Sequence, residues 1–294
     1  MLASVLSVSL LVSLLAYAYH VLAQFQQQQQ QQQQSLSSID SKSSKNVLIL
    51  TAHPDDECMF FGPTITALRD SKTRVHVLCL STETKRIVTN RLYIYLLGNA
   101  DGLGATRKKE LTRSCQVLGI PPVDVKALDH GQVNLFSFFS QDLQDGMKNT
   151  WSPTLIAGIV KDYVTKHKID TIITFDDYGV SGHPNHIAAY KGAQHFVNES
   201  CSNNKKVRLY RLSSILLPRK YIGIGDLVFM AVEQRLFPDR GRDAVLFVSS
   251  PSSYLVTHKA MRRHVSQLVW FRWLYVTFSR YMFVNQLVEV TPPV

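Results

Sequence analysis

Apolar and polar positions alternate with strand-like and helix-like spacing along most of the chain after residue 45. Four short apolar runs predict buried strands: residues 47–51, 75–81, 123–128 and 171–175. Four amphipathic segments predict helices: residues 62–70, 105–118, 154–167 and 184–197. Further strands are expected at residues 208–217 and 245–249. Strands that alternate with helices are typical of a mostly parallel sheet with helices on both faces, so we predict an α/β, Rossmann-like fold.

Two polar turns follow two of the predicted strands. The first is His53-Pro54-Asp55-Asp56-Glu57, and the second is Ser181-Gly182-His183-Pro184-Asn185-His186. An isolated Asp pair would be explained by capping of the next helix. Two histidine-containing turns instead favour one shared site, because ligands bind at the carboxyl ends of the strands in open α/β sheets. Imidazole and carboxylate ligands suit Zn²⁺ or another divalent metal, and a catalytic zinc needs three protein ligands and an open position.

The N-terminal part of the chain has a different composition. Residues 2–23 contain no Asp, Glu, Lys or Arg and would span about 33 Å as a helix, so we expect a transmembrane anchor at 1–23. A cleaved signal peptide is the alternative, because Ala16-Tyr17-Ala18 has the small-x-small pattern. Residues 24–45 are rich in Gln and Ser and predict a disordered linker. Lys42 and Lys45 follow the apolar segment and favour a cytosolic C-terminal part.

Net charge indicates which kind of partner to expect, and cysteine spacing indicates which structural sites to exclude. The 294-residue chain carries a net charge of +10 with only 18% charged residues, which indicates few acids and favours an anionic membrane surface over nucleic acid. Its four cysteines have no paired spacing, so they indicate neither a zinc ribbon nor a disulfide framework. Residues 259–283 contain cations and aromatic residues but no acid, and predict a long basic-aromatic helix at a lipid interface.

Five motifs resemble the zinc-dependent de-N-acetylases of the LmbE type, and the resemblance covers about residues 46–287. They are His53-Pro54-Asp55-Asp56-Glu57-Cys58-Met59-Phe60-Phe61, Thr106-Arg107-Lys108-Lys109-Glu110-Leu111, Val180-Ser181-Gly182-His183-Pro184-Asn185-His186, and residues 266–272 and 278–282. The resemblance implies one LmbE-like domain at 46–294. Residues 83–97 are expected to be an insertion, either a lip that contacts lipid or a partner, or translated intron sequence.

The resemblance also implies a role for each site residue. His53, Asp56 and His186 would bind zinc, and Asp55 would be the general base that later protonates the leaving amine. His183 would stabilise the oxyanion. Many members have Asp at the position of Asn185, so His183 is expected to lack the carboxylate that would keep it protonated.

Arg107 is expected either to hold the substrate's phosphate or sugar, or to form a surface ion pair with Glu110. The activity implied by the resemblance is hydrolytic removal of acetate from N-acetylglucosamine linked to phosphatidylinositol, in the synthesis of glycosylphosphatidylinositol anchors. The implied location is the endoplasmic reticulum membrane, with the catalytic domain facing the cytosol. One alternative is a de-N-acetylase of a soluble N-acetylated sugar or glycoconjugate, and another is a catalytically inactive scaffold subunit.

Overall fold

The computed structural model describes residues 46–71, 73–82, 103–128, 143, 150–202, 207–237 and 243–291, together with six single positions between residues 13 and 27. Most of the predicted anchor and linker, and all of the predicted insertion at 83–97, lie outside these residues. Within them, no helix is both long and apolar enough to cross a bilayer.

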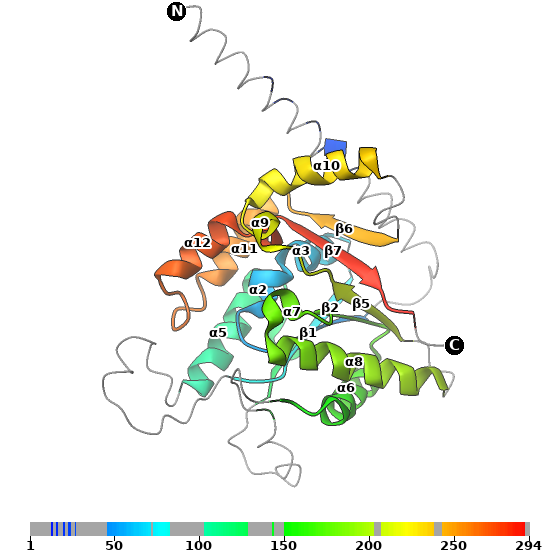
Figure 1. Ribbon diagram of the computed structural model, residues 1–294. Helices are drawn as coiled ribbons and strands as arrows, with labels where there is room; N and C mark the ends of the chain where they lie inside the picture. Colours follow the sequence, from blue (N-terminus) through cyan, green and yellow to red (C-terminus); the bar gives the residue numbers. More distant parts are fainter. Residues whose placement is uncertain are drawn as a thin grey trace, which may run out of the picture.

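A seven-stranded mixed sheet forms the centre of the domain (Figure 1). Five strands are mutually parallel: β1 (Asn46–Thr51), β2 (Arg74–Cys79), β3 (Val125–Ala127), β4 (Thr171–Thr174) and β5 (Arg208–Leu212). Two are antiparallel to their neighbours: β6 (Ala244–Val248) and β7 (Val284–Glu289). The strand order is β3-β2-β1-β4-β5-β7-β6. The prediction of a mostly parallel α/β sheet is therefore confirmed, although β7 was not predicted.

Helices cover the sheet on both faces (Figure 1). One group contains α6 (Pro153–His167) and α8 (Pro184–Ser202), which pack on each other, with α8 lying along β1, β4 and β5. The other group contains three helices that pack together: α3 (Gly62–Asp70), α5 (Gly104–Val117) and α11 (Pro251–Met261). The core between the layers is apolar because the strand residues from 47 to 50 and from 75 to 80, other than His76, present buried aliphatic or thiol side chains.

The remaining described helices lie between these elements along the chain. They are α2 (Asp56–Phe60), η1 (Pro122–Asp124), α7 (Gly179–Gly182), α9 (Leu217–Lys220), η2 (Gly223–Gly225), α10 (Asp226–Leu236), α12 (Trp270–Phe278) and η3 (Arg280–Met282). Helices α2 and α7 begin just after β1 and β4. The two predicted polar turns therefore lie at the carboxyl ends of adjacent parallel strands.

The prediction of one helix over residues 259–283 is wrong. Helix α11 ends at Met261, turns follow, and α12 begins at Trp270. The chain leaves the helix because two buried carboxylates bind the residues in between. His264 contacts Glu57 at 2.7 Å, and Ser266 donates its main-chain N–H and its hydroxyl to Glu110 at 2.9 and 2.5 Å. Tertiary polar contacts thus override the local helical pattern.

Strand β7 ties the C-terminal part of the domain to helices α2 and α3. The Asn285 side chain is fully buried and accepts hydrogen bonds from the N–H and the hydroxyl of Thr64, at 3.2 and 2.7 Å. Its amide nitrogen donates to the carbonyl oxygen of Phe60 at 2.8 Å. The last strand therefore fixes the junction between α2 and α3.

Candidate active site

Asp56 is held rigidly at the end of β1. Its Oδ2 accepts the main-chain N–H groups of Ala52 and His53, at 3.0 and 2.8 Å, and its Oδ1 lies 3.4 Å from Nε2 of His186. Burial by itself raises the pKa of this carboxyl, but the imidazoles of His186 and His53 outweigh burial, and the pKa is lowered overall. Asp56 is therefore a carboxylate with one oxygen directed at the histidine cluster.

The His186 ring has one tautomer and one orientation. Its Nδ1 lies 3.1 Å from the carbonyl oxygen of Gly179, which can only accept, so Nδ1 carries the proton. The ring stacks on Phe175 with a centroid distance of 3.9 Å and an interplanar angle of 2°. The other ring nitrogen, Nε2, therefore faces the Asp56 carboxylate. Two electron-pair donors at 3.4 Å fit a cation that both would bind.

The turn that presents the Gly179 carbonyl is organised by Asp176, a residue that sequence reasoning did not identify. The Asp176 carboxylate accepts from the N–H of Gly179 at 2.9 Å and from the N–H and hydroxyl of Ser214, each at 2.6 Å. Gly179 has φ +62°, and a Cβ added there would lie 2.9 Å from Cβ of His186. The only signal in the sequence is the carboxylate directly after the Phe175 strand end.

His53 and His183 complete the cluster. The ligand atoms of His53, His183 and His186 all lie within 4.8 Å of one another. The Asn185 side chain contacts Nε2 of His53 at 3.0 Å, whereas its main-chain N–H donates to Nδ1 of His183 at 3.3 Å. His183 Nδ1 is therefore an acceptor, which corresponds to a neutral ring with its proton on Nε2. The structure brings the three predicted metal ligands and His183 together, and this donor set fits one divalent cation.

Asp55 lies beside these residues in an unusual backbone conformation. Its φ is +101°, a region that non-glycine residues rarely adopt and that is concentrated at functional sites. Its N–H donates to Oε2 of Glu57 at 3.0 Å, and its carbonyl accepts from the N–H of Met59 at 2.9 Å. Its buried carboxylate lies 3.0 Å from Nη2 of Arg272. Asp55 is thus directed away from the backbone pocket that Asp56 occupies.

A buried ion pair supports this turn from beneath, and sequence reasoning missed it. Glu57 and His264 are both fully buried, and Ser114 donates its hydroxyl to Glu57 at 2.5 Å. Burial opposes both charges, but their mutual attraction dominates, so the pKa of Glu57 is lowered and that of His264 is raised. Glu57 belongs to the first polar turn, but no local pattern marks His264, which lies 207 positions later.

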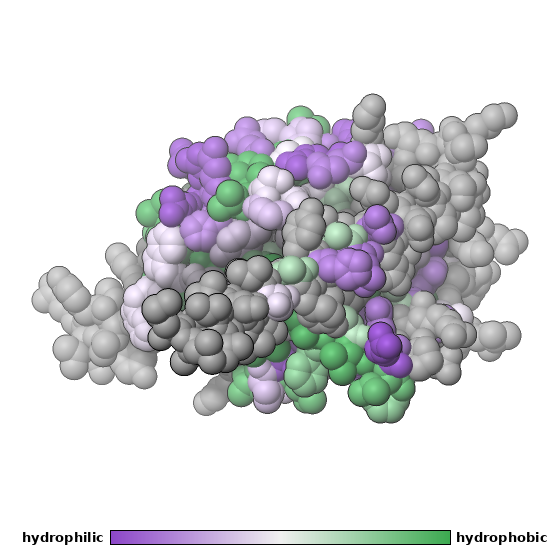
Figure 2. Space-filling model, turned by 90° about the horizontal axis from the view of Figure 1, so that it is seen from above, coloured by the Kyte–Doolittle hydropathy of each residue, from purple (hydrophilic) through white to green (hydrophobic). Residues whose placement is uncertain are grey.

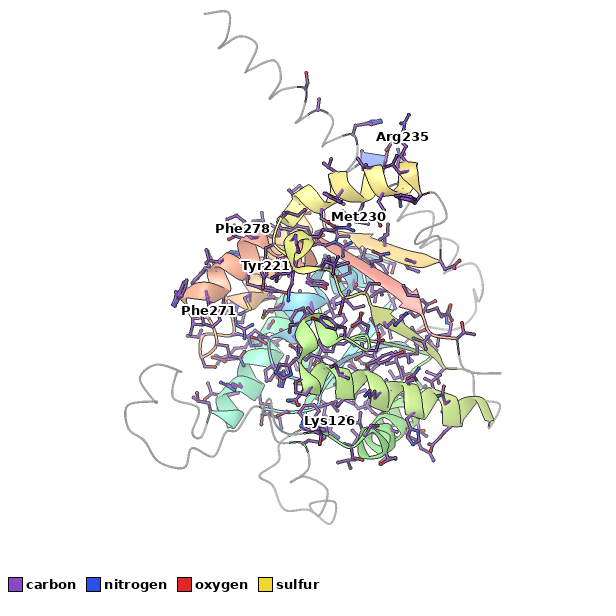
Figure 3. All side chains as sticks on the ribbon, viewed as in Figure 1. Lys126, Tyr221, Met230, Arg235, Phe271 and Phe278 are labelled. Atoms are coloured by element: carbon purple, nitrogen blue, oxygen red, sulfur yellow. The ribbon has the colours of Figure 1, made fainter. Side chains whose placement is uncertain are left out.

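The histidine cluster and the two aspartates line a cavity of about 720 Å³. One wall is the polar cluster of His53, Asp55, Asp56, His183 and His186. The other wall comes from α9, from α12 and from the residue directly after α9, and it is mainly aromatic with two cations: Lys220, Tyr221, Phe271, Arg272, Leu274, Tyr275 and Phe278. Figure 3 shows Tyr221, Phe271 and Phe278 on the same side of the molecule.

Arg107 is not among the residues that line this cavity. Its predicted neighbour Glu110 is 4% exposed and accepts from Ser266, so a surface ion pair does not describe Glu110. The substrate-binding role of Arg107 stays a prediction.

Comparison with known proteins supports a family assignment. The GlcNAc-PI de-N-acetylase (PIG-L) family model matches residues 48–197. A probable N-acetylglucosaminyl-phosphatidylinositol de-N-acetylase of Schizosaccharomyces pombe is 37% identical, over 84% of this chain and 88% of the relative. The Bos taurus N-acetylglucosaminyl-phosphatidylinositol de-N-acetylase is 36% identical, over 82% and 81% of the two chains.

A solved structure shares the fold. It is a deacetylase of the teicoplanin biosynthetic pathway, with a TM-score of 0.54 at 14% identity, over 85% of this chain and all of that one. The family model spans both polar turns, and the similarity to these relatives extends over most of the chain. The chain therefore belongs to the GlcNAc-PI de-N-acetylase family.

Proposed function

We propose that this protein hydrolyses the acetamide of N-acetylglucosaminyl-phosphatidylinositol, giving glucosaminyl-phosphatidylinositol and acetate, the second step of glycosylphosphatidylinositol-anchor synthesis. The observation that carries the proposal is the convergence of three imidazoles and Asp56 beside Asp55 in one cavity. The names of the fungal and bovine relatives support the substrate. The aromatic and cationic second wall of the cavity suits a substrate that carries both a phosphodiester and acyl chains.

The proposed metal ligands are His53, Asp56 and His186, and the proposed ion is Zn²⁺ or another divalent cation. Such an ion supplies Lewis acidity toward the amide carbonyl and acidifies a water molecule. The Asp56 contacts to the main chain and the His186 contact to Gly179 support this assignment, because they fix both ligands before any ion binds.

Asp55 is the proposed general base. It accepts the proton of the attacking water and returns it to the leaving amine nitrogen. The hydrogen bond from its N–H to Glu57 and the contact with Arg272 support this role, because both limit the directions in which the carboxylate can point. His183 is the proposed oxyanion donor, since its Nε2–H would donate to the oxygen that becomes negative on the attacked carbonyl. Arg107 is proposed to contact the substrate's sugar or phosphate.

The proposed organisation is an anchor at 1–23, a linker at 24–45 and a catalytic domain at 46–294 that faces the cytosol at the endoplasmic reticulum. Lys42 and Lys45 after the apolar segment support this placement.

Glycosylation tests the placement. Asn198-Glu199-Ser200 is an N-glycosylation motif, which is modified only in the lumen, so its state reports on which side of the membrane the domain lies. Asn198 is half-buried within α8 and does not lie in a loop. We expect no endoglycosidase-sensitive mass shift at Asn198. A shift that disappears in Asn198→Gln would place the domain in the lumen.

Acetate release by the purified full-length protein tests the activity. We expect release from vesicles that contain N-acetylglucosaminyl-phosphatidylinositol, loss of release after chelation, and recovery when Zn²⁺ is added back. Faster release from a water-soluble N-acetylated sugar would instead support a soluble-substrate de-N-acetylase. No release from either substrate by metal-loaded protein would support an inactive scaffold.

A further inference from the structure

Helix α10 has two apolar faces, and the core accounts for only one of them. Leu227 and Met230 pack against strands β6 and β7 in a small separate cluster with Leu246, Val248 and Val284. The opposite face presents a second set of apolar side chains to solvent: Val228, Phe229, Val232 and Leu236, which are 37, 58, 47 and 65% exposed. The i, i+4, i+8 spacing of residues 228, 232 and 236 places these side chains in one stripe.

Helix α12 has the same property. Tyr275 and Val276 are buried, whereas Trp270, Leu274 and Phe278 form an exposed i, i+4, i+8 stripe with exposed fractions of 75, 51 and 50%. Phe271, Leu274 and Phe278 also line the cavity. The exposed stripe of α12 is therefore continuous with the rim of the proposed active site.

The segment between α9 and α10 joins the two helices. The 3₁₀ helix η2 contacts both α10 and α12. Around it, Leu216, Leu217, Ile222 and Ile224 are 79, 69, 43 and 52% exposed. Figure 1 shows α10 and α12 on either side of α9, and Figure 3 places Tyr221 between Phe278 and Phe271. Figure 2 views the molecule from the side of α10 and shows groups of hydrophobic residues at the surface. We call the exposed residues of α9, η2, α10 and α12 and the residues between α9 and η2 the docking surface.

The charge around the docking surface has one sign. Residues 216–237 and 259–283 contain four exposed cations, Arg235, Lys259, Arg262 and Arg263, and only two acids, Asp226 and Glu233. Both acids are bound by Arg219 within the domain, at 2.6 and 3.0 Å. Arg219 also lies over the ring of Phe229 at 5.2 Å, and Arg262 lies over Trp273 at 5.4 Å. Aromatic and aliphatic side chains among cations complement the interface of a membrane that contains anionic phospholipid.

We propose that the docking surface inserts its apolar side chains into the interface of an anionic phospholipid bilayer, so that the cavity opens at the lipid surface. Two helices far apart in the sequence, α10 and α12, make this contact together. The expected entry of substrate from the bilayer rests on the function proposed above, but the lipid contact itself does not. A lipid-linked substrate would then reach the metal-ligand cluster without its acyl chains crossing water.

Tryptophan fluorescence tests the lipid contact independently of activity. The chain has three tryptophans, of which Trp151 is 3% exposed and Trp270 is 75% exposed, and the third, Trp273, also lies in α12. Residues 1–45 contain none, so the predicted anchor adds no signal. We expect the fluorescence of the full-length protein in anionic vesicles to fall when the acyl chains are brominated. Most of the fall should be lost in Trp270→Phe. Equal fluorescence in brominated and ordinary vesicles would overturn the proposal.

A charge on α10 tests whether both helices dock together. Phe229→Asp should lower the bromolipid quenching of Trp270 and lower turnover of lipid-linked substrate about tenfold, the effect expected for losing one buried aromatic side chain. Turnover of a water-soluble substrate analogue should be unchanged. The matched control is Val123→Asp, a 74% exposed position next to β3, at the opposite edge of the sheet from β6. An equal effect in the control, or a wild-type dimer that Phe229→Asp dissociates, would assign the surface to something other than lipid.

Discussion

Nη2 of Arg272 lies 3.0 Å from Oδ2 of Asp55, so the proposed general base is paired with a side chain from the opposite end of the chain. Arg272 lines the cavity from α12, and its Nη1 contacts the sulfur of Met59. These two contacts hold the guanidinium between α12 and α2, and the guanidinium in turn limits the orientation of the Asp55 carboxylate. Arg272 belonged to the basic-aromatic segment in the sequence-based prediction, where a lipid contact was its expected role.

Replacing Arg272 should slow the reaction without removing the metal. In Arg272→Gln, Asp55 loses its charged partner and its orientation, and we expect kcat for a water-soluble substrate to fall by about ten- to a hundredfold. Metal content, measured by atomic emission, should stay stoichiometric. Arg263→Gln, at an exposed position on the same segment, is the control and should keep full activity. An Arg272→Gln enzyme with unchanged kcat would show that the pair has no role in turnover.

Variants of the proposed metal ligands and of the proposed base should differ in metal content. Asp56→Ala and His186→Ala should lose metal and activity together, because two remaining ligands hold a catalytic zinc poorly. Asp55→Asn should keep its metal but lose most turnover, by about a hundredfold or more. Stoichiometric zinc in inactive Asp56→Ala would contradict the ligand assignment.

Gly179→Ala should damage the metal site through a backbone position. Its φ of +62° strains any side chain, and the new Cβ would lie 2.9 Å from Cβ of His186. We expect a loss of about 1–3 kcal/mol in the free energy of unfolding and weaker zinc binding, because the His186 ring is displaced. Zinc titration and chemical denaturation measure the two effects. Gly158→Ala, where a Cβ meets no atom within 4 Å, is the matched control. It should leave zinc binding unchanged and raise the free energy of unfolding by about 0.5–1 kcal/mol, because Ala is favoured over Gly inside α6.

The buried Glu57–His264 pair should make stability depend on pH. The pKa of His264 is raised above its usual 6.5, so its contribution is complete below pH 6.5 and is lost as the pH rises through the raised value. The pKa of Glu57 is lowered from 4.5, so its contribution is complete above pH 4.5 and is lost on acidification through the lowered value.

His264→Gln should therefore cost most stability between pH 4.5 and 6.5. The loss should be about 3–5 kcal/mol, because Glu57 is left charged and buried without its partner. Urea unfolding of both proteins across this range gives the difference. A difference that grows steadily above pH 7 would mean that the pair is not ionised in the folded protein.

Local periodicity was enough to predict most of the sheet and both polar turns, because β1, β4 and the residues after them are contiguous in sequence. The meeting of the two polar turns could be predicted for the same reason, since parallel strands place their carboxyl ends at one edge. The choice of His53, Asp56 and His186 as metal ligands came from the resemblance and stays a prediction. The break between α11 and α12 could not, because it depends on contacts of His264 and Ser266 with residues more than a hundred positions earlier. The Arg272–Asp55 pair depends on a contact of the same long range, and β7 depends on pairing with β5 and β6 earlier in the chain.

The position of strand β7 also determines which parts of the sheet can form while the chain is being synthesised. It lies between β5 and β6, and its Asn285 binds Thr64 and Phe60 beside the site. A ribosome delivers the N-terminal residues first, so β1 to β5 can assemble while β6 still lacks β7, its one neighbour among the described strands. The nascent chain therefore emerges with an open sheet edge and an unsupported α2–α3 junction. Both close only after residue 289 leaves the exit tunnel, and a chain that stops before residue 284 retains every proposed metal ligand but never completes the domain.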